Sequence, residues 1–103
     1  MLAALCACAA GQQFIPLGLL PGGTYSIGFD VSSFGPTVVG RADLPGFLDH
    51  AFRWTPTEGM NDLGTLGGDY SEASGVSADG STIVGEAYNS SNRSRPFRWQ
   101  NGI

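Results

Sequence analysis

The feature that most constrains the fold of this chain is a repeat with a period of 45 residues. Residues 70–99 align with residues 25–54 without a gap, and twelve of these 30 positions are identical. The identical pairs are Tyr25/Tyr70, Ser26/Ser71, Val31/Val76, Ser32/Ser77, Gly35/Gly80, Thr37/Thr82, Val39/Val84, Gly40/Gly85, Ala42/Ala87, Phe52/Phe97, Arg53/Arg98 and Trp54/Trp99. A fixed period of this length is typical of repeat architectures, in which each unit buries an apolar face against its neighbour.

Each unit is predicted to fold as a meander of four short antiparallel strands. The chain contains 16 glycines, and short runs that favour strands are separated by turn signals such as Asp79-Gly80. The expected strands cover residues 73–77, 82–88 and 96–99 in the second unit, and the fourth strand of the first unit covers residues 60–66. The pattern indicates an all-β protein.

Alternation along the strands predicts which side chains share a face. In the strand over residues 82–88, Ile83, Gly85 and Ala87 lie on one side. This face is small, so another sheet can approach it closely, and we expect neighbouring repeats to stack there. Phe97 and Trp99 lie together on one side of the next strand and should dominate the core of the unit.

The same short segment precedes both units. The run of residues 14–23 matches residues 61–68 from Ile15 onward, with Pro21 as one extra residue before a Gly-Gly turn. The matching positions are Leu17-Gly18 with Leu63-Gly64, and Leu20 with Leu66. We expect a strand over residues 14–20, and we hypothesise that it completes the sheet of a partner unit.

Four short strands in about 45 residues are typical of a β-propeller blade. A β-sandwich built from two similar halves is the alternative, because it too can use repeated hairpins. A closed propeller needs at least about four blades. We therefore expect further repeats or self-association.

The charge balance argues against two classes of partner. Lysine and arginine together number 5, aspartate and glutamate number 9, and the net charge is −4. Nucleic acids and anionic membrane surfaces attract basic proteins. We therefore expect no nucleic-acid partner. No apolar run reaches the ~20 residues of a transmembrane helix.

The first 13 residues look like the end of a secretory leader. Residues 1–10 are small and apolar, and they precede a polar stretch. A lipoprotein leader with Cys8 as the acylated residue is a related reading, and a short apolar strand of the mature fold is the other alternative. Cleavage there would leave the mature domain without Cys6 and Cys8. We therefore expect a truncated leader over residues 1–13, a first repeat with its preceding strand over 14–68, and a second repeat, truncated before its last strand, over 69–103.

A search for catalytic chemistry assigns no catalytic residue, cofactor or metal. His50 is the only histidine, and no Gly-x-Ser-x-Gly nucleophile motif is present. The acidic residues Asp62, Asp69, Glu72 and Asp79 are spread through turns and strand ends, where solvated carboxylates are the ordinary interpretation.

The two loops between the second and third strands are the parts of the units that do not repeat. In an up-and-down unit, this loop lies at the same end as the crossover between units, and function on rigid scaffolds often resides in such loops. Drift of an unconstrained surface would give the same difference. The candidate ligand residues are Asp69, Tyr70, Tyr88, Asn89, Asn92 and Arg93.

Three motifs together resemble a known family. They are His50-Ala51-Phe52-Arg53-Trp54, the Asp-Leu-Gly-Thr-Leu-Gly-Gly run of residues 62–68, and the Ala-Asp-Gly-Ser-Thr-Ile-Val-Gly-Glu-Ala run of residues 78–87. They resemble the HAF family of bacterial extracellular repeats, and the second unit departs from its motif at Arg95-Pro96. The resemblance implies an extracellular or cell-envelope repeat domain with no established activity. We expect a non-catalytic scaffold that binds protein or glycan, and a fragment of a carbohydrate-active propeller enzyme is the alternative.

Overall fold

Strands and turns make up the part of the chain that the structure describes. The computed structural model describes residues 14–100, and all of its regular elements are β-strands. They are β2 (Ser26–Val31), β3 (Val38–Leu44), β4 (Leu48–Thr55), β5 (Gly59–Gly64), β6 (Gly67–Val76), β7 (Thr82–Asn89) and β8 (Ser94–Gln100). The all-β prediction is confirmed for these residues. The expected leader over residues 1–13, with Cys8, lies outside them.

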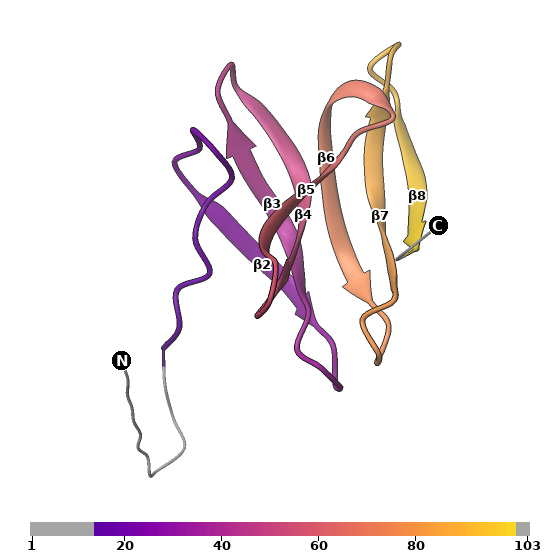
Figure 1. The fold of residues 1–103 in the computed structure, drawn as a ribbon. Helices are drawn as coiled ribbons and strands as arrows, with labels where there is room; N and C mark the ends of the chain where they lie inside the picture. Colours follow the sequence, from indigo (N-terminus) through magenta and orange to yellow (C-terminus); the bar gives the residue numbers. More distant parts are fainter. Residues whose placement is uncertain (1–13, 101–103) are drawn as a thin grey trace, which may run out of the picture.

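The strands form one curled sheet that consists of two strand groups (Figure 1). The two groups pack against each other through a shared core cluster. In the first strand group, β2 to β5, each strand pairs antiparallel with the next. The second strand group, β6 to β8, is paired in the same way. The groups are joined where β4 and β6 run parallel, with Asp49 opposite Tyr70. β5 covers the rest of this edge of β4, so β4 has different neighbours at its two ends.

The strand pairing follows the sequence repeat. Each of four residue pairs in the first strand group has a counterpart 45 residues later in the second. These are Gly28–Gly40 with Ala73–Gly85, Val31–Val38 with Val76–Ile83, Val38–Trp54 with Ile83–Trp99, and Gly40–Phe52 with Gly85–Phe97. Both β2 and β6 also have an irregularity at the same repeat position, between Gly28 and Asp30 and between Ala73 and Gly75.

Gly40 and Gly85 allow β3 and β7 to approach these irregularities. A Cβ atom at Gly40 would lie 1.8 Å from the Ile27 carbonyl oxygen, and one at Gly85 would lie 2.0 Å from that of Glu72. The irregularities in β2 and β6 follow directly after these carbonyl groups and bend the two strands there. The two glycines are thus required within one sheet, and not only by a second sheet packed on the small face, as the sequence suggested.

The core consists of two clusters on opposite faces of the first strand group. The cluster between the two groups contains Val39, Ala51, Ala73 and Ile83, all fully buried. The second cluster contains Leu20, Ala42 and Phe52 on the other face of β3 and β4. The first strand group is therefore covered on both faces.

The prediction that repeats stack on the small face is confirmed for one side of the contact. Ile83 turns this face of β7 toward the first strand group. In the first strand group, Val39 and Ala51 make this contact, and they lie on the face opposite to the one that corresponds to Ile83. The contact between the groups thus joins two unlike faces.

Residues 14–20 form no strand in the described chain, although a strand was expected there. Phe14 and Ile15 are exposed, whereas Leu20 is buried on Ala42 and Phe52. A strand needs a neighbouring strand edge for its backbone hydrogen bonds, and residues 14–20 pair with none.

Candidate functional site

Three chain connections gather at one end of the molecule (Figure 1). They are the β3–β4 turn, the β7–β8 turn and the crossover from β5 to β6. The sequence predicted that these connections share an end. Asp49 and Tyr70 pair just below it, so this end also contains the point where the two strand groups join.

A polar cluster centred on Arg41 occupies the join between the groups. One guanidinium nitrogen of Arg41, Nη1, lies 2.8 Å from the Tyr70 hydroxyl and 3.2 Å from Glu72 Oε1. Its Nε lies 4.0 Å from Asp49 Oδ2. These contacts connect β3 and β4 of the first group with β6 of the second. Because the side chains of Arg41, Asp49 and Glu72 are each about one quarter exposed, the cluster is open to solvent.

Tyrosines extend the cluster on both sides. The Tyr25 hydroxyl donates to Asp49 Oδ1 at 2.7 Å, and this bond raises the pKa of Tyr25. Tyr70 donates to Glu72, and burial followed by this bond raises the pKa of Tyr70. The rings of Tyr70 and Tyr88 lie 5.1 Å apart with a tilt of 45°. The raised pKa values of Tyr25 and Tyr70 keep these two hydroxyls protonated, and therefore donors, at neutral pH.

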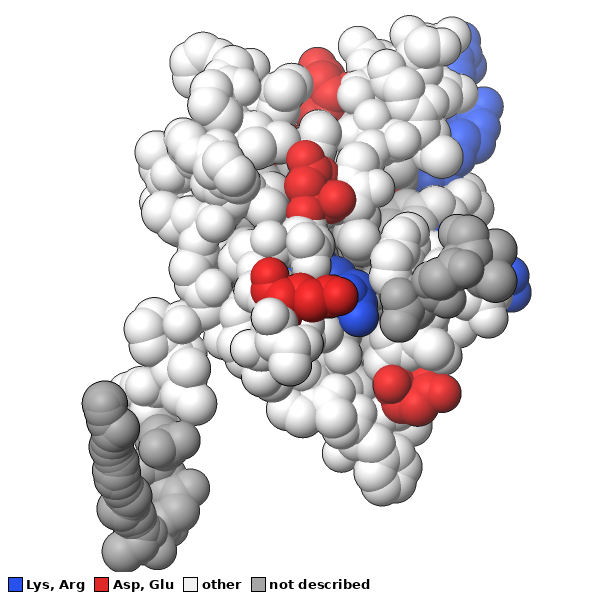
Figure 2. Space-filling model, in the orientation of Figure 1, with Lys and Arg blue, Asp and Glu red and all other residues white. Residues whose placement is uncertain are grey.

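The charges are distributed unevenly over the surface. In the view of Figure 2, acidic side chains follow the join between the two strand groups, and a basic side chain lies among them. The other basic side chains in this view gather on the β8 side. Arg95 and Arg98 belong to β8, and Arg93 immediately precedes it.

The structure brings some of the predicted ligand residues together and separates others. Tyr70 and Tyr88 are in contact, whereas Asp69 and Arg93 are exposed. Asn89 caps the β7–β8 turn, because its Oδ1 accepts hydrogen bonds from the backbone N–H groups of residues 91 and 93. Asn92 occupies this turn with a φ of 56°. The turn therefore uses part of the hydrogen-bonding capacity of Asn89 for its own structure.

Sequence analysis missed Arg41 and Asp49 as members of this cluster and treated Glu72 as an ordinary surface carboxylate. All three occupy positions at which the two units differ, because Arg41 corresponds to Glu86, Asp49 to Ser94 and Glu72 to Ile27. A departure from the repeat at a polar strand position was the signal that could have identified them.

Both carboxylates of the cluster are engaged by a tyrosine hydroxyl and by Arg41. Asp49 accepts from Tyr25 and faces Arg41, and Glu72 accepts from both Tyr70 and Arg41.

His50 takes part in a separate contact. Its Nδ1 lies 2.8 Å from Asp62 Oδ1, and the same oxygen accepts a bond from the Gly64 N–H at 2.7 Å. This pair fastens the end of β5 to β4. Within residues 14–100, no group of three or more His, Cys, Asp and Glu side chains is placed to hold a metal ion.

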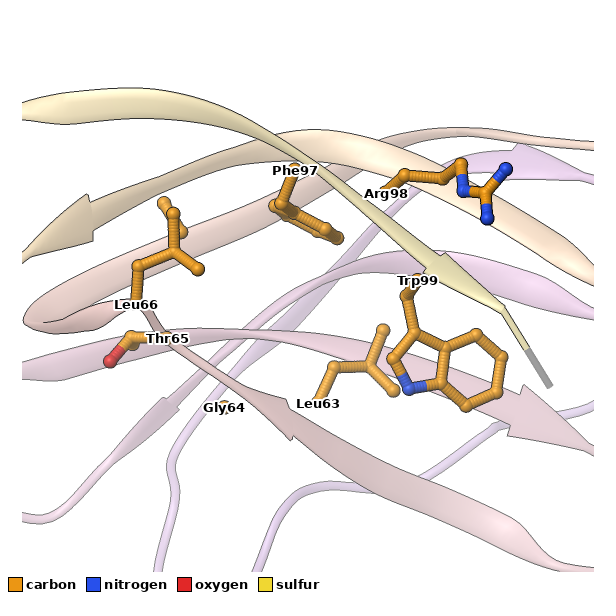
Figure 3. Close-up of a pocket in the computed structure, with 8 residues that line it drawn as sticks. Leu63, Gly64, Thr65, Leu66, Phe97, Arg98 and Trp99 are labelled. Carbon is orange, nitrogen blue, oxygen red and sulfur yellow. The ribbon is translucent and has the colours of Figure 1, made fainter. Parts of the chain in front are cut away.

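An apolar recess lies under β8. Leu63 of β5 and Leu66 in the β5–β6 connection face Phe97 and Trp99 of β8 (Figure 3). The recess has a volume of about 140 Å³. This volume is below the ~300 Å³ at which pockets for small molecules begin.

Comparisons with known proteins leave the family open. No family, curated protein or solved structure matches the chain. The resemblance to the HAF family therefore stays a prediction. No helix that could cross a membrane occurs in the described part of the chain.

Proposed function

We propose that the chain is a non-catalytic extracytoplasmic repeat module that acts as a scaffold for protein or glycan binding on a bacterial surface or secreted protein. The apolar leader-like residues 1–13 and the resemblance to HAF repeats support the location. The scaffold consists of β-propeller-like blades, each a four-stranded meander. The shared register of the two strand groups supports this architecture, because each blade of a propeller repeats the same pairing.

One observation carries the binding role. The Tyr70–Tyr88 ring pair lies beside the partly exposed Arg41 cluster, at the end where the loops do not repeat. Sugars and peptides are bound by aromatic faces together with fixed polar groups, and this end supplies both. The hydroxyls, the guanidinium and the carboxylates hold one another in place, so little conformational entropy is lost on binding.

The test combines a glycan array with a panel of glycoside hydrolase substrates, using the full chain. We expect binding without turnover, and Tyr88→Ala should weaken it by about tenfold, which corresponds to the loss of one aromatic contact. Phe34→Ala is the matched control, because Phe34 is an exposed aromatic residue in the β2–β3 connection at the opposite end.

Two results would contradict the proposal. Turnover of a glycan by the wild-type chain, lost in Asp49→Asn or Glu72→Gln, would support the enzyme-fragment alternative. Glycan or protein binding that Phe34→Ala abolishes and Tyr88→Ala leaves intact would place the binding surface at the other end.

A further inference from the structure

The end of β5 and the residues after it show how the chain passes from one strand group to the next. β5 pairs with β4 in the first group, and Leu63 and Leu66 then lie over Phe97 and Trp99 of the second. A partly buried hydrogen bond fixes this passage, because the Ser71 hydroxyl donates to the Gly64 carbonyl at 2.5 Å. Residues 59–66 therefore contact both strand groups.

Residues 14–20 repeat the second half of this arrangement on the first strand group. The Ser26 hydroxyl donates to the Gly18 carbonyl at 2.9 Å, as Ser71 does to Gly64. Both glycines have positive φ angles, 99° for Gly18 and 85° for Gly64. Leu20 is buried on Phe52, whereas its counterpart Leu66 lines the recess with Phe97 and is 47% exposed.

Residues 14–17 lack the first half of this arrangement, which is the pairing with a neighbouring strand. Phe14 and Ile15, the counterparts of Met60 and Asn61 in β5, are 104% and 61% exposed. At the other end of the molecule, β8 pairs only with β7 among the described residues. The chain thus presents an unpaired strand-like segment and an unpaired strand edge.

The recess beneath β8 lies where a counterpart of Met60 would sit. Met60 pairs with Trp54 and packs on Phe52, and its Cγ lies 3.9 Å from the Cβ position of Gly18. The corresponding location in the second group adjoins Gly64, Phe97 and Trp99, and these residues line the recess. Its volume of about 140 Å³ resembles the ~150 Å³ of an apolar cavity that takes a benzene ring.

We infer that residues 14–17 of a second copy of this chain add to β8 as its missing neighbour strand, with Phe14 filling the recess. The register follows from β4 and β5, which places Phe14 opposite Trp99 and Ile15 opposite Arg98. This is recognition by strand addition, in which backbone bonds provide affinity and the side-chain pocket sets the register. The inference rests on the repeat part of the proposed function and is independent of its ligand.

Pro16 is compatible with this register. The Ala51 N–H points away from β3, because it donates to Ser71 Oγ. Since N–H groups alternate sides along a strand, Arg53 also faces β5, and its partner Asn61 turns its own N–H toward β4. The next N–H, that of Asp62, points outward. Pro16 occupies the position of Asp62, so the absence of its N–H removes no bond to β8.

The contact between the strand groups predicts a second part of the interface. Arg53 lies over the Trp99 ring at 5.3 Å from its centroid. Its counterpart Arg98 is exposed, and so is Val84, the counterpart of buried Val39. In the assembly, Arg98 covers Trp54 of the second copy. The association joins unlike faces of the two copies, head to tail, and can close into a ring.

Sedimentation velocity over a dilution series tests the association with the full chain. A reducing agent keeps Cys6 and Cys8 from forming intermolecular disulfides. We expect the wild type to associate and Phe14→Asp to weaken association by about tenfold or more, because a charge replaces a buried ring. Phe47→Asp is the matched control, since Phe47 is also 104% exposed but lies in the β3–β4 turn.

Photo-cross-linking tests the register separately. A photoreactive phenylalanine analogue at position 14 should attach to the 97–99 segment of another copy. A wild-type chain that stays monomeric at all concentrations would overturn the inference, as would equal effects of Phe14→Asp and Phe47→Asp. Cross-links to any other segment would overturn the register. None of these results alters the expected glycan binding, so the two proposals fail independently.

Discussion

At the residue scale, the glycines opposite the two irregular strands are the positions least open to change. Gly40 faces the Ile27 carbonyl, and Gly85 faces that of Glu72. The obstacle in each case is backbone, which cannot turn away as a flexible side chain can. The close backbone contact within each strand group therefore explains why both units have glycine at this position.

Gly40→Ala should lower the free energy of unfolding by about 2–4 kcal/mol, because the new methyl group forces β2 away from β3. Urea denaturation followed by tryptophan fluorescence measures this change. Gly28→Ala is the matched control. Its Cβ would meet only the Val38 side chain, at 3.4 Å, and should cost well under half as much. Equal costs would show that the close backbone approach is not what requires Gly40.

Asp43 should make the stability of the protein depend on pH. The Thr24 hydroxyl, and then the backbone N–H groups of Tyr25 and Thr24, lower its pKa from the ordinary value of 3.8. Since the folded pKa lies below the unfolded one, the stabilisation is complete above the unfolded pKa and is lost as pH falls through the folded pKa.

Replacement of Asp43 by Asn should therefore reduce the difference in urea midpoint between neutral pH and about pH 3. Asp69→Asn serves as the control, because Asp69 is exposed and its side chain makes no hydrogen bond within the described residues. An unchanged difference in Asp43→Asn would show that the Thr24 contacts do not stabilise the charged form.

At the scale of elements, Ser71 connects three strands. It is fully buried, accepts a bond from the Ala51 N–H of β4 at 2.7 Å, and donates to the Gly64 carbonyl of β5. Because Ser71 itself belongs to β6, one hydroxyl satisfies a buried and a partly buried backbone group at the junction of the two strand groups. Among residues 14–100, its counterpart Ser26 has only the bond to Gly18.

Ser71→Ala should cost about 2 kcal/mol of unfolding free energy, since it leaves the buried Ala51 N–H and the partly buried Gly64 carbonyl without this partner. Ser26→Ala should cost roughly 0.5–1 kcal/mol, because Ser26 is half-buried and makes a single bond. Thermal and urea unfolding of both variants would measure the two costs. A loss in Ser26→Ala as large as that in Ser71→Ala would contradict this account.

At the scale of the whole molecule, the two strand groups share one core cluster, so each should stabilise the other. Ile83→Ala removes buried volume next to Val39, Ala51 and Ala73. It should cost about 2–4 kcal/mol and should speed hydrogen exchange in β3 and β4 as well as in β7. Exchange confined to β7 would mean that the groups open separately.

Val84→Ala is the comparison on the opposite face of the same strand. Val84 is 46% exposed, and its truncation should change the unfolding free energy of the monomer by no more than about 0.5 kcal/mol. The same variant should weaken self-association, because the second copy would cover Val84 in the proposed assembly. A large effect on the monomer would show that this face is already covered.

Much of the fold could be predicted because the signals are local. The alternation of side chains, the Gly-Gly turns and the 45-residue period predicted the strand order and the common end of the loops. The candidate site was predicted less completely. Tyr70 and Tyr88 meet as neighbours, but Arg41, Asp49 and Glu72 come from three strands, and no local pattern brings them together.

The sequence by itself determined the period and the approximate positions of most strands, since these depend on residues close in the chain. Only the tertiary structure decided which faces are covered. Val39 and Val84 are the same residue at the same repeat position, yet one is fully buried and the other is 46% exposed. Residues 14–17 and 60–63 occupy matching positions, yet only the second segment lies largely in a strand. The physical reason is that burial and strand pairing require a neighbour, and a neighbour is a property of the assembled molecule.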